Sequence, residues 1–283
     1  MLNFLQTYRS AFFFICVLFA LSSFSAKAQA EDRPLIVTSF SILQDITANL
    51  AGEKAQVISL VGPNSDAHVY QPTPADIRQL AKASMLVENG LGFEGWLSRL
   101  LTANNFKGIK VVASDGITPI YKAQRNNKPD PHAWHSFSAI KVYVENITLG
   151  LIKLSPNNKD YFITNKNNYL AQINQLEAEL KQKFAAKAKQ QAKFLVPHAA
   201  FAYLESEFNV SLIAPQGIST SSEPSAKQLA ELLNLLKDEQ IAAIFTENLS
   251  SDKFMLSLSQ ASNIQIAGQL FSDSLSNTNE IAP

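Results

Sequence analysis

Hydrophobic residues follow two alternating spacings along the chain from residue 35 onward. Short runs rich in Val and Ile predict strands, and the stretches between them repeat every three or four residues, as helices do. Strands that alternate with helices along a chain form parallel sheets. We therefore expect an α/β fold with two lobes, each with a parallel four-stranded sheet. The predicted strands are 35–37, 56–61, 85–88, 110–113, 194–196, 210–214, 242–246 and 264–267.

Two helix starts have specific end signals. Ser41 is predicted to cap a helix that ends at Gly52. Thr73, followed by Pro74 and Asp76, has the residues of a helix N-terminus: a capping hydroxyl, a proline in the first turn and an early acid. Further helices are predicted at 138–154, 201–208, 225–239 and 252–262.

The segment 156–191 is predicted to be one long helix. It contains no Gly, and no Pro between Pro156 and Pro197, and its hydrophobic residues keep a helical spacing. At about 1.5 Å per residue it would reach roughly 50 Å, too long for a packing element of one small lobe. We interpret it as a rigid strut between two lobes. The alternative is a helical hairpin with its turn at 165–168.

The first 30 residues are typical of a signal peptide. Arg9 is the only charged residue before position 27, the run 11–21 is wholly hydrophobic, and 26–30 offers small residues for cleavage after Ala28 or Ala30. The alternative, a membrane anchor, needs a longer hydrophobic run. Cys16 lies inside the hydrophobic run without a lipoprotein motif before it, so we expect it to leave with the leader. The mature protein is predicted to be exported and to have no transmembrane segment.

These boundaries give four predicted parts: the signal peptide 1–30, a first lobe 31–155, the linking helix 156–191, and a second lobe 192–283.

Composition and charge exclude several classes of protein. The chain has 46% hydrophobic and 17% charged residues, as globular proteins do. Lys and Arg balance Asp and Glu at 24 each, so the basic excess of a phosphate-neutralising nucleic-acid binder is missing. A single cysteine excludes an intrachain disulfide framework and Cys-based zinc modules.

Histidines and one aspartate late in the chain are the candidate metal-binding residues. Any single histidine is more often a capping or core residue than a ligand. However, His68 and His198 follow predicted strands, His132 lies in a loop before a helix, and Asp273 follows the last strand. Ligands of open α/β sheets bind beyond the carboxyl ends of the strands. Three imidazoles and a carboxylate favour tetrahedral zinc, with manganese or iron as weaker alternatives.

The spacing of these candidates argues against a structural zinc finger. They lie roughly 65 to 75 residues apart, so we expect a metal that sits between lobes and is bound and released.

Several stretches resemble motifs of the zinc/manganese solute-binding proteins of ABC importers, bacterial solute-binding protein family 9. The resemblance runs in order from about residue 35 to 275. Its carriers are Asp66-Ala-His68-Val-Tyr-Gln-Pro-Thr-Pro-Ala-Asp76, Glu88-Asn-Gly-Leu-Gly-Phe-Glu-Gly-Trp96, Asp130-Pro-His132-Ala-Trp134, His198-Ala-Ala-Phe201-Ala-Tyr203, Glu223-Pro-Ser225 and Ile244-Phe-Thr-Glu247.

The resemblance implies two Rossmann-like lobes joined by one long rigid helix. It implies a metal held by His68, His132, His198 and Asp273, and because manganese-selective members usually carry Glu at the third place, His198 favours zinc. It further implies a periplasmic, monomeric, non-enzymatic subunit that delivers Zn²⁺ to an inner-membrane permease with its cytoplasmic ATPase, without a nucleic-acid partner.

The chain departs from the family in three places. His135 stands where Leu, Met or Gln is usual, and the alternatives are a group that supports the ligands or a surface residue. The segment 118–128 lacks the histidines of a metal-scavenging loop. Relatives usually continue past the place of Asp273 for another helix, which leaves two alternatives for the end at Pro283: a truncated sequence, or a second lobe without its last cover.

Two functional alternatives to a zinc carrier are considered. One is a manganese or iron carrier of the same family. The other is a zinc-dependent hydrolase, which needs an open coordination position and a general base. The sequence has neither H-E-x-x-H nor G-x-S-x-G, and four protein ligands would close the site. Carriage is therefore the predicted function.

Overall fold

The computed structural model describes residues 33–121, 128–187, 192–215, 217, 226–238, 241–249 and 252–277. Residues from Pro34 onward form one compact unit, and Met1–Arg33 is a separate unit described only at Arg33. The predicted signal peptide with Cys16 and its cleavage positions, and the chain end at Pro283, lie outside the described residues. Among the described residues, no helix combines the length and hydrophobicity needed to cross a membrane.

The first lobe is built on a parallel sheet of four strands. Their order is β2-β1-β3-β4, so the chain starts on an inner strand, adds β2 on one side and then crosses to β3 on the other side of β1. The elements are β1 (Leu35–Phe40), α2 (Ser41–Ala51), β2 (Gln56–Val61), α3 (Pro74–Lys82), β3 (Met85–Glu88), α4 (Leu97–Asn104), β4 (Ile109–Val112), the short helix η3 (Ala133–His135) and α5 (Phe137–Leu154).

The second lobe repeats this topology with its own four strands in the order β6-β5-β7-β8, all parallel. The α/β class and the two parallel four-stranded sheets are therefore confirmed. The first and last residues of the second-lobe helix predicted at 225–239 lie outside the described residues. The elements are β5 (Lys193–Leu195), α7 (Ala202–Phe208), β6 (Ser211–Ile213), α8 (Ala226–Asp238), β7 (Ile241–Glu247), α9 (Lys253–Ser262) and β8 (Ile266–Leu270).

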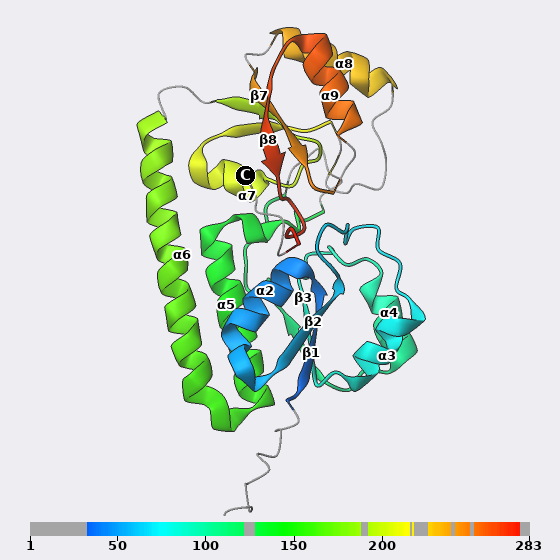
Figure 1. Ribbon diagram of the computed structural model, residues 1–283, viewed down its shortest axis with the longest axis vertical. Coiled ribbons are helices and arrows are strands. Elements are labelled where there is room, and N and C mark those ends of the chain that lie inside the picture. The colour runs from blue at the N-terminus through cyan, green and yellow to red at the C-terminus, as the bar shows by residue number, and fades with distance from the viewer. Residues whose placement is uncertain are drawn as a thin grey trace, which may run out of the picture. The chain divides into compact units, whose positions relative to one another are not determined.

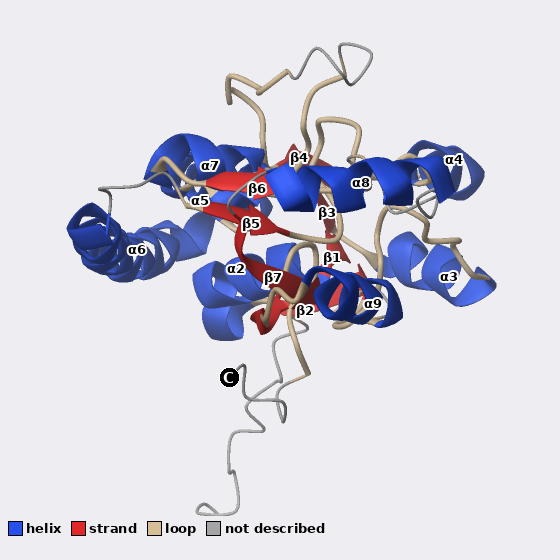
Figure 2. Cartoon of the chain, turned by 90° about the horizontal axis from the view of Figure 1, so that it is seen from above, coloured by secondary structure: helices blue, strands red, loops and turns tan. Residues whose placement is uncertain are grey.

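Each sheet is covered by helices on both faces (Figure 2). Central strands covered in this way are rich in hydrophobic residues, and β1 and β3 each begin with three of them in succession. Ile36, Val37 and Leu86 are fully buried in the core of the first lobe. The second lobe has a smaller core of its own, in which Leu195 and Ile244 are fully buried.

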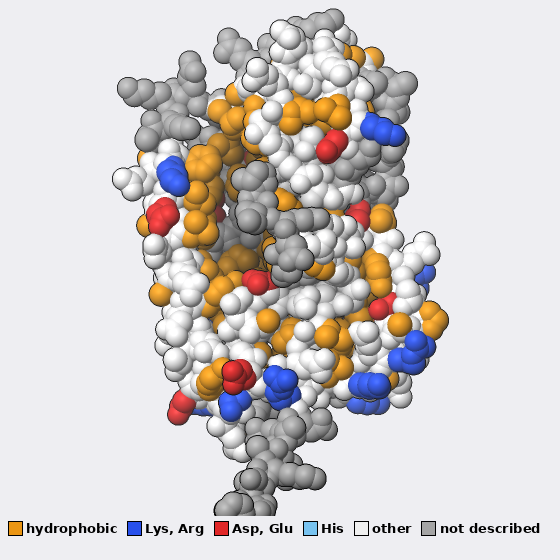
Figure 3. All heavy atoms as spheres, viewed as in Figure 1, with side chains coloured by type: hydrophobic (Ala, Val, Ile, Leu, Met, Phe, Trp, Pro, Cys, Tyr) orange, Lys and Arg blue, Asp and Glu red, His pale blue; other side chains and the backbone are white. Residues whose placement is uncertain are grey.

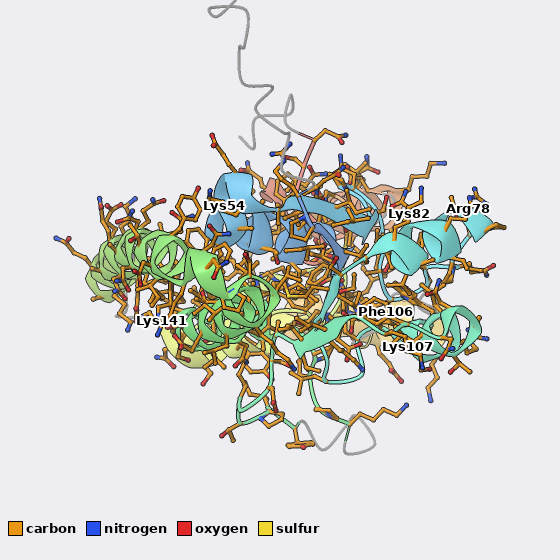
Figure 4. All side chains as sticks on the ribbon, turned by 90° about the horizontal axis from the view of Figure 1, so that it is seen from below. Lys54, Arg78, Lys82, Phe106, Lys107 and Lys141 are labelled. Carbon is orange, nitrogen blue, oxygen red and sulfur yellow. The ribbon has the colours of Figure 1, made fainter. Side chains whose placement is uncertain are left out.

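One long helix, α6 (Lys159–Lys187, 29 residues), connects the two lobes. It runs unbroken through 165–168, so the hairpin alternative is excluded; 188–191 lie outside the described residues. Figure 1 shows α6 beside α5, and Lys141 of α5, labelled in Figure 4, pairs with Glu177 of α6 at 2.6 Å. At its far end, the ring of Phe184 lies 4.5 Å from that of Phe208 in the second lobe.

The strut interpretation needs one correction. Phe162 and Ile173 of α6 are buried in the core of the first lobe, so the helix is also a packing element of that lobe. Its upper part borders a hollow of about 440 Å³, lined by Leu176 and Leu180 of α6 and by His135. Figure 3 shows hydrophobic side chains gathered in a hollow on this side of the molecule. The helix therefore packs tightly on one lobe and touches the other near its end.

The two predicted helix caps have different outcomes. Thr73 forms the expected capping box with Asp76 at the start of α3. In α2, however, the N-cap residue is Phe40, and no side-chain cap hydrogen bond is present. Ser41 is already the first helical residue, and its hydroxyl bonds to the segment that follows β8. The capping role predicted for Ser41 is therefore wrong, and its hydroxyl serves a contact between distant parts of the chain.

Candidate metal centre

The four residues predicted as ligands converge on one point. One ligand atom from each of His68, His132, His198 and Asp273 lies within 4.8 Å of the other three. The Nε2 atoms of His68 and His132 are 3.1 Å apart. The carboxylate of Asp273 approaches Nε2 of His68 at 3.3 Å, of His132 at 3.5 Å and of His198 at 3.1 Å. Three imidazole nitrogens and a carboxylate oxygen thus face a common centre.

Loops at the ends of strands deliver these side chains. His68 follows β2, His198 follows β5 and Asp273 follows β8, while His132 directly precedes η3. Figure 1 shows β8 pointing from the second lobe toward the first. The residues meet because parallel strands end at the same edge of their sheet, where open α/β folds place their ligands.

The centre is almost closed to solvent. His132, His198 and Asp273 are fully buried, and the side chain of His68 is 6% exposed. Beside His68 lies a cavity of about 460 Å³, also lined by Phe93, Pro129 and Pro131. The edge of the Phe93 ring contacts the imidazole, with centroids 4.6 Å apart. The cavity therefore reaches the centre on the side of His68.

Carboxylates fix the rings of two histidines. Nδ1 of His132 bonds to Asp130 at 2.7 Å, and Nδ1 of His198 bonds to Glu247 at 2.6 Å. Because a carboxylate accepts, Nδ1 is the protonated donor in each neutral ring, and Nε2 keeps its lone pair toward the centre. This carboxylate–histidine arrangement is the one that orients imidazoles around protein-bound metals and makes them stronger ligands.

Several buried polar atoms at the centre lack hydrogen-bond partners. Within the described part of the chain, Nε2 of His198 and both carboxylate oxygens of Asp273 form none. Buried polar groups in proteins are nearly always paired, since an unpaired one keeps the full cost of losing its hydration. A cation at the centre would satisfy all three atoms at once.

Charge at the centre shifts the pKa values of its groups. Burial alone would raise the pKa of Asp273, but His198 and His132 outweigh it and hold that pKa well below its usual range. Burial would lower the pKa of His198, yet Asp273 and Glu247 raise it to about 10. For His132 burial dominates and lowers the pKa. Without a cation, His198 is therefore the imidazole that holds a proton beside Asp273.

Motif residues of the first lobe hold the loop that carries His68 and the segments beside it. The indole Nε1 of Trp96 donates to the carbonyl of Ala67 at 2.8 Å, and the amide of His68 donates to Asp66 at 2.8 Å. Glu94, from the same motif as Trp96, accepts from the hydroxyl of Ser39 and the amide of Asn89, both at 2.6 Å. These motif residues therefore fix the His68 loop and the segment at the end of β3.

His135 does not join the four converging donors. Its Nε2 donates to the carbonyl of Ser272 at 2.8 Å, and its ring lies 4.7 Å from that of Phe201. Burial, followed by the nearby charge of His132, lowers its pKa to about 4, so the ring stays neutral. Of the two alternatives left by the sequence, its contacts favour the supporting group: His135 is a half-buried neighbour of the segment that carries Asp273.

Glu247, Asp130 and Ser272 contact ligand residues, but the sequence reasoning assigned no role to them. A signal for Glu247 was available, because it ends β7 at the same sheet edge that His198 occupies after β5. Of the other predicted features, the motif 223–225 and most of the histidine-free segment 118–128 lie outside the described residues.

The sequence matches one protein family over residues 36–282, described as zinc-uptake complex component A, periplasmic. Among similar proteins, a manganese ABC transporter substrate-binding lipoprotein of Streptococcus pneumoniae is 31% identical over 278 residues, covering 94% of this chain and 90% of the relative. The iron-binding protein YfeA of Yersinia pestis is 31% identical over 281 residues, covering 95% and 88%.

Solved structures have the same fold. The periplasmic zinc-binding protein TroA of Treponema pallidum superposes with a TM-score of 0.81 at 26% identity, covering 88% of this chain and 92% of that protein. A manganese-bound periplasmic metal-binding protein of Candidatus Liberibacter asiaticus gives a TM-score of 0.77 at 28% identity, covering 88% and 93%.

Proposed function

The chain belongs to the family of periplasmic zinc-uptake complex component A proteins and is the metal-binding subunit of an ABC importer, and we propose that its cargo is zinc. The proposed ligands are His68, His132, His198 and Asp273. The observation that carries the proposal is the convergence of these four donors within 4.8 Å of one another. Support comes from the buried atoms among them that form no hydrogen bond, since one cation would satisfy them together.

Donor chemistry is the argument for zinc over manganese or iron. Zinc favours four-coordinate sites with nitrogen donors, whereas manganese prefers oxygen ligands and a larger shell. Three of the four proposed donors are imidazoles, and the Irving–Williams order adds to their preference for zinc. The similar proteins named above divide among manganese, iron and zinc, so the family alone does not select the ion.

We also propose that the protein carries its ion without catalysis. A catalytic zinc keeps one coordination position for water or substrate and needs a general base beside it. Here four protein donors surround the centre, and the nearest carboxylates, Asp130 and Glu247, are engaged by ligand imidazoles. Nothing about this donor set leaves a place for a reacting water.

The remaining parts of the proposal concern the protein's location, its domain boundaries and its partner. Relatives act outside the cytoplasm, and we propose that residues 1–30 export this chain to the periplasm as a monomer with a first lobe 31–155, a linking helix 156–191 and a second lobe 192–283. Importers of this kind work with a membrane permease and its ATPase, and we propose an inner-membrane permease as the partner that receives zinc.

The experiment is a metal-binding study of the protein purified from the compartment in which it resides. Native mass spectrometry would report the ion carried and its stoichiometry, and competition titrations would rank Zn²⁺, Mn²⁺ and Fe²⁺. We expect one equivalent of zinc, held more tightly than the other two ions. An excess of manganese or iron in the native protein would assign the cargo to that ion, and turnover of ester, peptide or phosphate substrates would contradict a pure carrier.

A further inference from the structure

The four residues from Ser272 to Leu275 lie beyond β8 of the second lobe but bond extensively to the first lobe. We call this segment the strap. At its end, the amide of Leu275 donates to the hydroxyl of Ser41 at 3.0 Å, and the amide of Asn64 donates to the carbonyl of Leu275 at 3.0 Å. The hydroxyls of Ser41 and Ser274 are 3.3 Å apart. Asp273 lies inside the strap.

The start of the strap is held by two donors on one atom. The indole Nε1 of Trp134 donates to the carbonyl of Ser272 at 2.7 Å, and Nε2 of His135 donates to the same oxygen at 2.8 Å. A carbonyl oxygen has two lone pairs, so both are used. The peptide unit directly before Asp273 is thereby fixed to the segment that carries His132.

Among the described residues, the second lobe makes fewer bonds to the strap, and they come from two residues adjacent in the sequence. The hydroxyl of Ser272 donates to Glu247 at 3.1 Å, and the side-chain amide of Asn248 donates to the carbonyl of Ser274 at 3.4 Å. Glu247 also orients His198. Ser272 is therefore bonded to both lobes. Its carbonyl accepts hydrogen bonds from the first lobe, and its hydroxyl donates to Glu247, which holds His198.

We propose that Ser41 and His135 are positioning residues, which fix Asp273 to the first lobe through the strap. This inference rests on the proposed function. It divides the four ligands unequally: His68, His132 and Asp273 are held by the first lobe, and His198 alone is held by the second. Chain order alone would give an equal division, because Asp273 follows β8 of the second lobe.

The division has a physical consequence for binding. Three donors held on one rigid body keep their mutual geometry when the lobes shift, so the first lobe retains a partly formed site. Movement of the second lobe then acts mainly on the bond to His198, while the bonds of Ser272 to Glu247 and of Ser274 to Asn248 link the strap to that lobe more weakly. Loss of the strap would leave Asp273 free to move, and the ion would then meet two fixed donors instead of three. The strap is thus expected to slow the release of zinc.

A double-mutant cycle tests the proposal. Zinc dissociation constants are measured by chelator competition for Ser41→Ala and His135→Leu, each in the wild-type and in the Asp273→Ala background. A net contribution typical of one hydrogen bond predicts that each single change weakens binding about two- to tenfold. If the residues act through Asp273, neither change weakens binding further once Asp273 is replaced.

Two additional variants and one hydrogen-exchange measurement separate positioning from general loss of structure. His135→Gln retains an N–H donor for the Ser272 carbonyl and should restore most of the affinity lost in His135→Leu. Ser259→Ala removes a 2.6 Å hydrogen bond to Ile264 in the second lobe and should leave zinc binding unchanged. In Ser41→Ala, hydrogen exchange at the Leu275 amide should accelerate while the amides of β8 keep their protection.

The outcomes are distinguishable from those of the proposed function. If the wild-type protein binds no zinc, the proposed function fails, and the inference falls with it. If wild-type binding is tight and Asp273→Ala weakens it, but Ser41→Ala and His135→Leu have no effect or keep their full effect in the Asp273→Ala background, the inference alone is overturned.

Discussion

Glu247 accepts a hydrogen bond of 2.6 Å from Nδ1 of His198, and both side chains are buried. Asp130 holds His132 in the same way at 2.7 Å. Two imidazoles are therefore oriented by carboxylates from their own lobes before any ion arrives. The predictions below follow from this arrangement and from the burial of the groups around it.

Removal of a proposed ligand should have a far larger effect than removal of His135. His68→Ala, His132→Ala and His198→Ala each leave an open, less favourable coordination shell, so zinc affinity should fall by orders of magnitude. His135→Ala removes only a hydrogen bond to Ser272 and should cost about tenfold at most. Competition titration with a chelator measures both. Equal losses for His135→Ala and His132→Ala would show that the wrong histidine was assigned.

The carboxylate behind His198 should also matter. Glu247→Ala removes the group that fixes the ring, and zinc affinity should fall about ten- to a hundredfold, as for other partners of metal-bound histidines. Glu247→Gln keeps an oxygen acceptor and should lose less. Glu231→Gln, on the exposed surface of α8, is the matched control. Equal affinity of Glu247→Ala and wild type would contradict an orienting role.

Zinc binding should displace a proton from His198. Asp273 and Glu247 overcome burial and raise the pKa of this imidazole to about 10 in the metal-free protein, so at pH 8 the ring carries a proton that the ion must replace. Affinity should therefore rise with pH until about 10. Calorimetric titration at pH 8 in buffers of different ionisation enthalpy measures this proton. Identical apparent enthalpies in all buffers would refute it.

Glu94 should make the metal-free protein less stable as pH rises. Burial raises the pKa of this carboxyl from 4.5 to about 7, despite the hydrogen bonds from Ser39 and Asn89. The folded state thus keeps a proton that the unfolded state has released, so stability falls between about pH 4.5 and pH 7, by about 3 kcal/mol from this group. Denaturant unfolding across this range should show a flatter profile for Glu94→Gln. A profile as steep as that of wild type would assign the loss to other groups.

Zinc should change the arrangement of the lobes only slightly. The helix α6 is unbroken over 29 residues and packs against the first lobe, so it does not offer the flexible crossings of a clamshell hinge. Small-angle scattering of metal-free and zinc-loaded protein should give nearly equal radii of gyration. A large decrease on zinc binding would mean that α6 bends or that its contact at Phe208 breaks.

Much of the fold and the proposed ligand set could be predicted because the signals are local or follow from topology. Hydrophobic runs identified the strands, and the rule for sheet edges brought His68 and His198 together. The helix α4 was missed because its eight residues are too few to establish a periodic pattern beside the Glu88–Trp96 motif.

The strap could not be predicted, for a different reason. A serine before a helical pattern favours an N-cap, and Ser41 satisfied that rule, yet its partners Ser274 and Leu275 lie 233 and 234 residues away. No local pattern encodes such a pair. The same holds for His135, whose partner Ser272 follows 137 residues later. The assignment of Asp273 to a strand end was possible, but the lobe that holds it was not deducible.

The distance in sequence between Ser41 and the strap has a consequence for folding kinetics. Paired strands of each sheet lie at most 49 residues apart in the chain, whereas Ser41 and Ser274 lie 233 residues apart, so their contact requires a much longer loop to close. The two sheets should therefore form before the strap docks, and the centre is completed last. Zinc then binds to a chain that has already folded, so the ion is not needed to direct folding.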